Sequence, residues 1–314
     1  MKYICISMSP AVDALVELDR APKGEGEIFK NVMPVDNVGG KAINVARWLA
    51  IREKEAREVV LYGLLGEDNA VLFEKEFAKY SLVDRMKRIA GSTRRNQMIV
   101  WPGGSVKLNE AAFPSLETDA VIGFGDLDEA PDFGKDDIAI ISGSLPPTLM
   151  PSLYAMFVIG LCGFGVKTVL DSSGAALKYG LEAQPYLIKP NAEECEPLVG
   201  FVPKTPKEFL LATDILRGKE KRPNLRGRSE HVLISDGAAG AWYDGEFVPA
   251  PKVNRVVDTT AAGDTLLAEF CYRHFGEGME AIAALKCAVA AGSAAVMHPG
   301  AEPPLEDEVA GLIE

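Results

Sequence analysis

The segment Asp258–Phe270, DTTAAGDTLLAEF, combines residue types that can bind an anion and transfer a proton. Its small residues Ala261, Ala262 and Gly263 let a ligand approach the backbone, and their N–H groups at a helix start form an anion site. Asp264 would follow in the first helical turn, where its carboxylate can take a proton from an alcohol while the amides stabilise a transferring phosphoryl group. A capped helix with an acidic first turn explains the same residues without catalysis.

A second turn that can bind a ligand is Val38–Asn44, VGGKAIN, at the start of a predicted helix. Gly39 and Gly40 permit close approach, Lys41 supplies a positive donor, and Asn44 can reach a sugar hydroxyl from the first helical turn. The spacing is not that of a Walker A loop. A plain strand–helix turn is the alternative interpretation.

The segment Tyr186–Leu198, YLIKPNAEECEPL, predicts a strand that ends at a lysine and a helix that begins two residues later. Lys189 can meet a nucleotide phosphate, while Asn191 and Glu194 can organise Mg²⁺ through water. The alternative is a helix cap followed by acidic first-turn residues, which the helix dipole alone explains.

Basic residues gather in Gly91–Val100, GSTRRNQMIV, where Arg94, Arg95 and Asn96 follow one another. Arginines can clamp a phosphate through two parallel hydrogen bonds. Exposed, solvated arginines are the usual alternative.

Three further turns contain glycine. Ile140–Pro147, IISGSLPP, predicts a buried strand that runs into a Ser-Gly-Ser turn, and Val232–Gly245, VLISDGAAGAWYDG, a strand, a Gly-rich turn and a short hairpin. Val121–Ala130, VIGFGDLDEA, has a G-x-G but no third glycine and no apolar helix after it, so we expect no dinucleotide fingerprint there.

The elements that must position these turns alternate between short apolar runs and helix-length segments, which predicts a doubly wound α/β domain with a mostly parallel sheet. The predicted strands are Tyr3–Met8, Val59–Leu64, Ile138–Ser142, Val166–Asp171, Tyr186–Ile188 and His231–Ser235. The predicted helices are Ala42–Glu53, Ala70–Tyr80, Leu149–Cys162, Pro206–Arg217, Gly263–Phe275 and Met279–Met297.

Two stretches break this alternation, Ala14–Asp36 and Thr93–Asn109, which hold short alternating pieces separated by glycines. They predict a small antiparallel sheet that projects from the main domain. Because ligands of open α/β sheets bind at the carboxyl ends of the strands, this projection can serve as a lid.

Composition narrows the function classes. The 314 residues are 47% hydrophobic and 25% charged, as in a soluble globular protein, and the net charge of −12 argues against a nucleic-acid partner. Five scattered cysteines without a C-x-x-C pair indicate a reducing, cytoplasmic setting, and three distant histidines argue against a multi-His metal site. The stretch Ala281–Met297 contains Lys286 and is too short to span a membrane, so we expect no membrane partner.

In this order and spacing, the segments resemble the ribokinase-like PfkB carbohydrate kinases, and within them the 1-phosphofructokinase and tagatose-6-phosphate kinase branch. The resemblance extends from SPAVD at 9–13 to AAGSAAV at 290–296, and its most specific pieces are GGKAIN, STRRN, SGSLPP, VLDSSGAALKYGLEAQPYLIKPNAEE and DTTAAGD. It implies an α/β kinase domain of three layers, α/β/α, over residues 1–314, with a small β-sheet lid formed by about 14–36 and 93–109. Members of the family often form homodimers through this lid.

The resemblance implies ATP and Mg²⁺ as cofactors, a sugar phosphate as small-molecule partner, and the following site residues. Asp264 matches the catalytic base, with Ala261, Ala262 and Gly263 as the anion hole. The substrate residues are Asp13, Gly39, Gly40, Lys41, Asn44, Arg94, Asn96 and Ser142, of which Lys41, Arg94 and Asn96 match the region that holds the existing phosphate. The nucleotide residues are Lys189, Asn191, Ser235, Gly237, Gly240 and Asp258, and Glu194 matches the metal residue.

The sequence departs from the family at four positions. Ser9 stands where Asn is usual, and Ala42, Ala70 and Ala261 stand where Gly is usual. Fructose 1-phosphate is the leading expected acceptor, before tagatose 6-phosphate and fructose 6-phosphate. A kinase of an unphosphorylated sugar or nucleoside remains a second hypothesis, and a non-catalytic sugar-phosphate or nucleotide sensor a third.

Overall fold

The computed structural model describes residues 1–30, 32–54, 56–113, 116, 133–222 and 225–313. In these ranges the main element is a nine-stranded sheet with the order β13-β12-β11-β10-β9-β8-β1-β4-β5. Its strands pair in parallel except for β12 and β13, which are antiparallel at one edge. The strands are β1 (Tyr3–Ser7), β4 (Val59–Gly66), β5 (Val83–Ile89), β8 (Ile138–Ser142), β9 (Lys167–Asp171), β10 (Leu187–Ile188), β11 (His231–Ser235), β12 (Gly240–Tyr243) and β13 (Glu246–Pro249).

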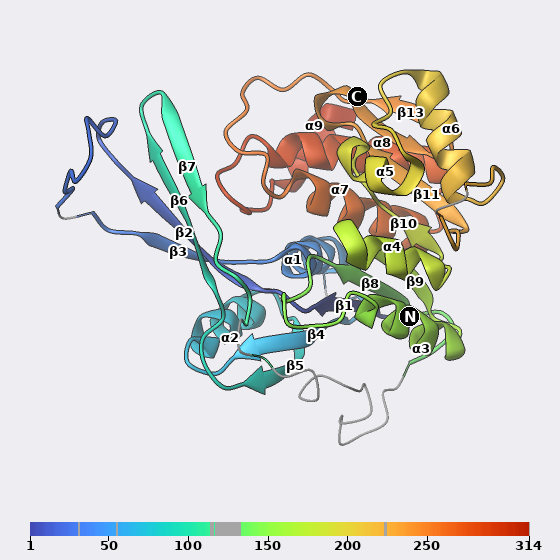
Figure 1. The fold of residues 1–314 in the computed structure, drawn as a ribbon, viewed down its shortest axis with the longest axis horizontal. Helices are drawn as coiled ribbons and strands as arrows, with labels where there is room; N and C mark the ends of the chain where they lie inside the picture. Colours follow the sequence, from blue (N-terminus) through green and yellow to red (C-terminus); the bar gives the residue numbers. More distant parts are fainter. Residues whose placement is uncertain (31, 55, 114–115, 117–132, 223–224, 314) are drawn as a thin grey trace.

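Helices cover both faces of this sheet (Figure 1). Successive strand residues point to opposite faces, so Tyr3 and Cys5 join one buried core while Ile4 and Ile6 join the other. The first core includes residues of α1 (Lys41–Glu53), α2 (Ala70–Lys79), α7 (Ala262–Cys271), α8 (Ala281–Ala295) and α9 (Glu306–Ile313). The second includes residues of α3 (Leu153–Gly163), α4 (Gly174–Glu182), α5 (Ala192–Val199) and α6 (Pro206–Leu216). The predicted three-layer α/β/α fold is confirmed.

A second, four-stranded sheet with the order β3-β2-β6-β7, here called the small sheet, projects from the main body (Figure 1). Its strands are β2 (Ala11–Glu17), β3 (Val35–Gly39), β6 (Arg95–Trp101) and β7 (Gly104–Leu108). The prediction of a small antiparallel sheet holds for the pairs β2–β3 and β6–β7 and is wrong for β2 and β6, which pair in parallel. β2 and β6 follow the parallel strands β1 and β5, so both enter the small sheet in the same direction.

The predicted element boundaries need several corrections. Helix α3 begins at Leu153 and not at Leu149, since Pro151 lies in the turn before it. Helix α7 ends at Cys271, and a π-helical segment, Tyr272–Gly276, continues it. Three elements, β5, α4 and α9, were not predicted from the sequence. β5 is an edge strand rich in polar residues, so it lacks the run of apolar residues that marks the central strands.

Two other predictions concern the G-x-G segment and a membrane partner. Val121–Ala130 lies outside the described residues. No helix in the described ranges combines the length and hydropathy that a membrane crossing requires.

The side of the sheet on which the chain adds new strands changes at β1. From β1 the chain adds β4 and β5 on one side, and it later returns to add β8, β9, β10 and β11 on the other. In doubly wound sheets, ligands bind outside the carboxyl ends of the strands at such a switch point. A ligand site is therefore expected beyond the ends of β1 and β8.

Candidate active site

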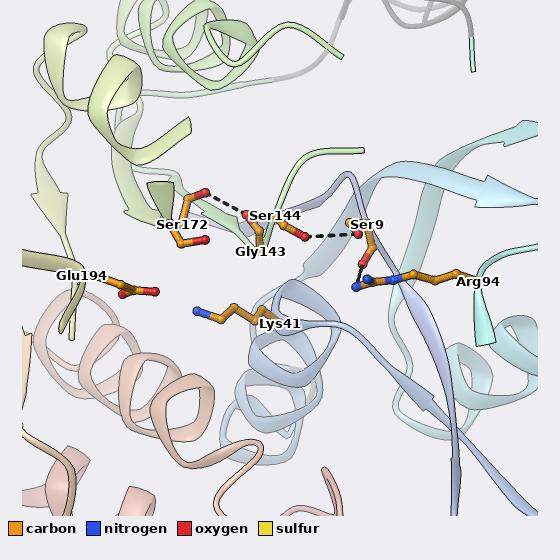
Figure 2. A pocket seen from close by; sticks show the side chains of 8 residues that line it. Ser9, Lys41, Arg94, Gly143, Ser144, Ser172 and Glu194 are labelled. Carbon is orange, nitrogen blue, oxygen red and sulfur yellow. Dashed lines mark hydrogen bonds between the residues drawn. The ribbon is translucent and has the colours of Figure 1, made fainter. Parts of the chain in front are cut away.

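A cavity of about 210 Å³ lies at this position. Residues that follow β1, β8 and β9 line it together with the first residues of α1 and α5 and one residue at the base of the small sheet (Figure 2). The lining residues are Ser9, Lys41, Arg94, Gly143, Ser144, Ser172, Ser173 and Glu194. Three of these, Lys41, Arg94 and Glu194, are candidate site residues from the sequence.

Asp171, a carboxylate that was not among the residues predicted from the sequence, lies between two lysines of the site. It lies at the end of β9, is completely buried, and pairs with Lys41 and Lys189, each Nζ lying 3.2 Å from Asp171 Oδ1. Burial alone would raise the pKa of Asp171, but the two ammonium groups lower it below its usual value. The available signal was its place as the last residue of a buried strand, in VLDSSG.

Ser142, expected among the substrate residues, supports this carboxylate. Its side chain is buried at the end of β8, and its hydroxyl donates to Asp171 Oδ2 at 3.1 Å. This bond directs Ser142 toward Asp171.

Asp264 lies in the first turn of α7 and is buried, with 3% of its surface exposed. The side-chain amide of Asn44 donates to Asp264 Oδ2 at 2.8 Å. Burial raises the pKa of Asp264 to about 7, with Lys41 and Asn44 acting in the opposite direction. A carboxyl group with a pKa near neutrality is suited to accept a proton from an alcohol.

The turn before Asp264 retains the features of an anion site. In the described part of the chain, the amide groups of Gly263 and Asp264 have no hydrogen-bond acceptor, as expected at a helix start. Lys189 lies close by, since a Cβ added to Gly263 would stand 3.5 Å from its Nζ. Ala261 has φ −106° and ψ 6°, so alanine needs no left-handed backbone there.

Lys41, the first residue of α1, extends toward Glu194 (Figure 2). Burial would lower the pKa of Lys41, but the carboxylates of Asp171, Asp264 and Glu194 outweigh it and keep the amine protonated. The preceding Gly40 has φ 119°, a conformation that favours glycine.

The nucleotide candidates Asn191 and Glu194 form a capping box at the start of α5. Asn191 Oδ1 accepts from the Glu194 amide at 2.7 Å, and Glu194 Oε2 accepts from the Asn191 amide at 2.9 Å. The capping interpretation is thus observed, and Glu194 also lines the cavity. Among the described residues, no group of three His, Cys, Asp or Glu side chains could hold a metal ion.

The remaining nucleotide candidates lie in turns. Ser235 ends β11 beside Asn191, while Gly237 and Gly240 have φ values of 51° and 136° that favour glycine. Asp258 accepts hydrogen bonds from the amides of Thr260 and Gly300, so its side chain holds together the loop before α7. These four residues do not line the 210 Å³ cavity.

The base of the small sheet brings Asp13 and Asn96 together. They are paired across β2 and β6, and Asn96 Nδ2 donates to Asp13 Oδ1 at 2.9 Å. Gly39 lies against them, because a Cβ there would come within 1.9 Å of the Asp13 carboxylate.

The two arginines of this segment differ. Arg94 donates to the backbone carbonyls of Ser9, Pro10 and Glu110, and it makes no salt bridge with the described residues. Burial lowers the pKa of Arg94. Arg95 instead pairs with Asp36 at 2.6 Å on the exposed sheet.

Comparisons with known proteins find similar sequences and similar folds. The family described as pfkB family carbohydrate kinase matches residues 7–308. The 1-phosphofructokinase of Haemophilus influenzae is 33% identical over 93% of this chain and 90% of its own, and that of Vibrio cholerae is 31% identical over 95% and 90%.

Solved structures with a similar fold include phosphofructokinase-2 from Escherichia coli in complex with substrates and products. It has a TM-score of 0.84 and 23% identity, with 99% of this chain and 98% of that chain covered. Ribokinase from Giardia lamblia has a TM-score of 0.74 and 18% identity, with 99% of both chains covered.

Proposed function

Because the chain belongs to the pfkB family of carbohydrate kinases, and so is a phosphotransferase with an alcohol acceptor, we propose that it transfers the γ-phosphoryl group of ATP to a hydroxyl of fructose 1-phosphate. The observation that carries the proposal is the buried Asp264, whose pKa of about 7 suits a general base, beside two lysines and the amides that start α7. The curated relatives named 1-phosphofructokinase favour this acceptor.

In the proposed reaction, Asp264 accepts the proton of the attacking sugar hydroxyl. We expect the amides of Ala261 and Gly263, with that of Asp264, to stabilise the charge on the transferring phosphoryl group, as a preorganised anion hole does. The expected third member, the Ala262 amide, donates to the Thr259 carbonyl at 3.4 Å and would have to leave it to take part. Lys189 and Lys41, each paired with Asp171, supply positive charge on the donor side. For Lys41 this differs from the expectation that it holds the acceptor's existing phosphate, because its side chain extends toward Glu194 (Figure 2).

Arg94 is the residue that we expect to hold the acceptor's existing phosphate. Its guanidinium lies at the Ser9 side of the cavity, away from Glu194 (Figure 2). It contacts neutral carbonyls and no carboxylate among the described residues, so its charge remains available for an anion. Asp13 would accept a hydrogen bond from a sugar hydroxyl, and Asn96 would donate one to a sugar hydroxyl.

The residues present fit a magnesium ion that arrives with ATP. Mg²⁺ is commonly bound through one or two carboxylates together with substrate phosphates and water. Glu194 offers one carboxylate at the cavity wall, next to Lys41. When bound, the ion would neutralise charge on the phosphates of ATP.

We propose that the small sheet is a lid over the substrate. Lys107 on β7 supports this role, since its Nζ donates to Thr260 Oγ1 at 3.0 Å in the loop before α7. The contact links the small sheet to the catalytic turn.

We propose that the enzyme is cytoplasmic. Cys5 and Cys271 are free thiols that form no disulfide, as is usual in a reducing compartment, and the proposed phosphoryl donor is ATP.

The outer face of the small sheet favours pairing with a second copy of the chain. Val16, Ile99 and Val106 stand opposite one another across β2, β6 and β7, on the face away from Asp13 and Asn96. An apolar row on an exposed sheet is typical of an interface. We propose a homodimer through this face.

A coupled assay of ADP release tests the function. Fructose 1-phosphate, fructose 6-phosphate, tagatose 6-phosphate, the free sugars and a nucleoside are each supplied with ATP, with and without Mg²⁺. We expect Mg²⁺-dependent turnover with the highest kcat/KM for fructose 1-phosphate. Activity confined to unphosphorylated acceptors would overturn the sugar-phosphate assignment, and binding without turnover of any acceptor would identify a sensor.

A further inference from the structure

Arg47, a residue of α1 with no role in the sequence prediction, makes a chain of contacts that ends at Asp264. Its side chain is buried, with 4% of its surface exposed. Arg47 Nη2 donates to Asn44 Oδ1 at 2.6 Å, and Asn44 Nδ2 donates to Asp264 Oδ2 at 2.8 Å. The three side chains therefore form one hydrogen-bonded series from the interior of α1 to the start of α7.

The chemistry of the three side chains determines which end of the Asn44 amide faces Arg47 and which faces Asp264. A guanidinium group has only donors, so it must face the carbonyl oxygen of the Asn44 side chain. That leaves the NH₂ group of Asn44 toward Asp264. With the amide reversed, two oxygens would face each other whenever Asp264 is ionised.

The position of Arg47 is fixed independently of the active site. Nη2 also donates to the carbonyl of Ala301 at 3.0 Å, and Nη1 pairs with Glu76 of α2 at 2.9 Å. Arg47 is thus anchored to a second helix and to the loop after α8.

We propose that Arg47 is a positioning residue for the catalytic base: by fixing the side-chain amide of Asn44, it keeps a hydrogen-bond donor on Asp264. This inference rests on the proposed role of Asp264. The amide donor favours the ionised carboxylate, the form that accepts a proton. Without Arg47 the amide can turn, and its oxygen would then favour the protonated form.

Other charged groups also face the two ends of this series. Lys41 of α1, Asp171 of β9 and Lys189 after β10 act on the charge of Asp264. Glu76 of α2 faces Arg47. A test must separate the effect of the Asn44 amide from the direct effect of the Arg47 charge.

The first experiment measures the pKa of Asp264 without any substrate. Protein labelled with ¹³C at the aspartate carboxyl carbons is titrated by NMR, and Asp264→Asn identifies the signal. We expect Arg47→Met to raise the pKa of Asp264 by about one unit. In the Asn44→Ala background, the same substitution should give no further shift, because its effect passes through Asn44.

A matched control removes the ion pair with Glu76 but keeps the contact with the Ala301 carbonyl and the series. Glu76→Gln breaks the ion pair of Arg47 and leaves its bond to Asn44, so the pKa of Asp264 should stay unchanged. Arg47→Leu, which also has no donor for Asn44 Oδ1, provides the same test if Arg47→Met does not fold. A shift that persists in the Asn44→Ala background would overturn the proposal, since Arg47 would then act by charge alone.

The second experiment follows turnover. Arg47→Met should lower kcat roughly ten- to a hundredfold, because a misplaced base loses its alignment, with KM for ATP nearly unchanged. Arg47→Lys should recover part of the loss. An Arg47→Met protein with normal kcat contradicts the proposal, whereas an inactive unmodified protein contradicts the kinase function and leaves the NMR result to decide on Arg47.

Discussion

At the scale of single residues, Asp264 links the reaction to pH. Burial raises the pKa of Asp264 to about 7, so the ionised base is depleted as the pH falls below that value. We expect kcat/KM to decline on the acidic side of pH 7 and to level off above it. Asp264→Asn should lower kcat roughly 10²- to 10⁴-fold and abolish this acidic limb. A loss of less than about fivefold would exclude Asp264 as the base.

Arg94 and Lys41 line one cavity, but they contact different groups, so we expect their replacement by alanine to have different kinetic effects. Arg94→Ala should raise KM for the sugar phosphate roughly ten- to a hundredfold, the value of a charge-assisted contact, with little change in KM for ATP. Lys41→Ala should mainly lower kcat, because Lys41 pairs with Asp171 near Asp264. Arg95→Ala is the control, since Arg95 pairs with Asp36 on the exposed sheet. Steady-state kinetics with each substrate varied in turn would contradict this division if all three variants behaved alike.

Ala261 replaces the family's usual glycine, and its backbone explains why this is tolerated. Its φ of −106° lies outside the left-handed region, so a Cβ adds no backbone strain. Ala261→Gly should therefore change kcat by less than about tenfold, or about 1.4 kcal/mol in the barrier. Single-turnover assays provide the measurement. A rise of several orders of magnitude would instead identify the natural chain as a degenerate kinase.

At the scale of elements, two capping boxes permit a matched comparison. Asn191 and Glu194 cap α5 at the cavity, whereas Thr205 and Glu208 cap α6 by the same pattern elsewhere. Asn191→Ala and Thr205→Ala should each lower the free energy of unfolding by about 1 kcal/mol. Asn191→Ala alone should also raise KM for ATP. Denaturant unfolding and kinetics of both variants check this, and equal KM values would leave Asn191 with a capping role only.

The elements also explain which parts of the site the sequence could predict. DTTAAGD and KPNAEE are local signals, because a turn or cap depends on residues a few positions apart. The role of Asp171 does not depend on neighbouring residues. Asp171 pairs with Lys41, which is 130 positions away in the sequence, because β9 lies next to β8 and so close to the switch point at β1.

At the scale of the whole molecule, the outer face of the small sheet is the proposed interface of a homodimer. Val106→Asp would place a charge in the proposed interface and should convert a dimer into a monomer, since an unpaired buried charge is costly. Ser105→Asp, on the opposite face of β7, is the control and should remain dimeric. Sedimentation of the three proteins decides this. A monomeric unmodified protein at micromolar concentration would contradict the proposed dimer.

The sequence by itself determined the alternation of strands and helices, the two layers of helices and the turns that carry Lys41, Asp264 and Glu194. These features depend on hydrophobic periodicity and on local turn chemistry, which neighbouring residues encode. The tertiary structure decided the parallel pairing of β2 with β6, because strand direction depends on where each strand leaves the main sheet. It also decided the partners of Asp171 and the link from Arg47 to Asp264, since contacts between distant segments arise only when the sheet order brings their ends together.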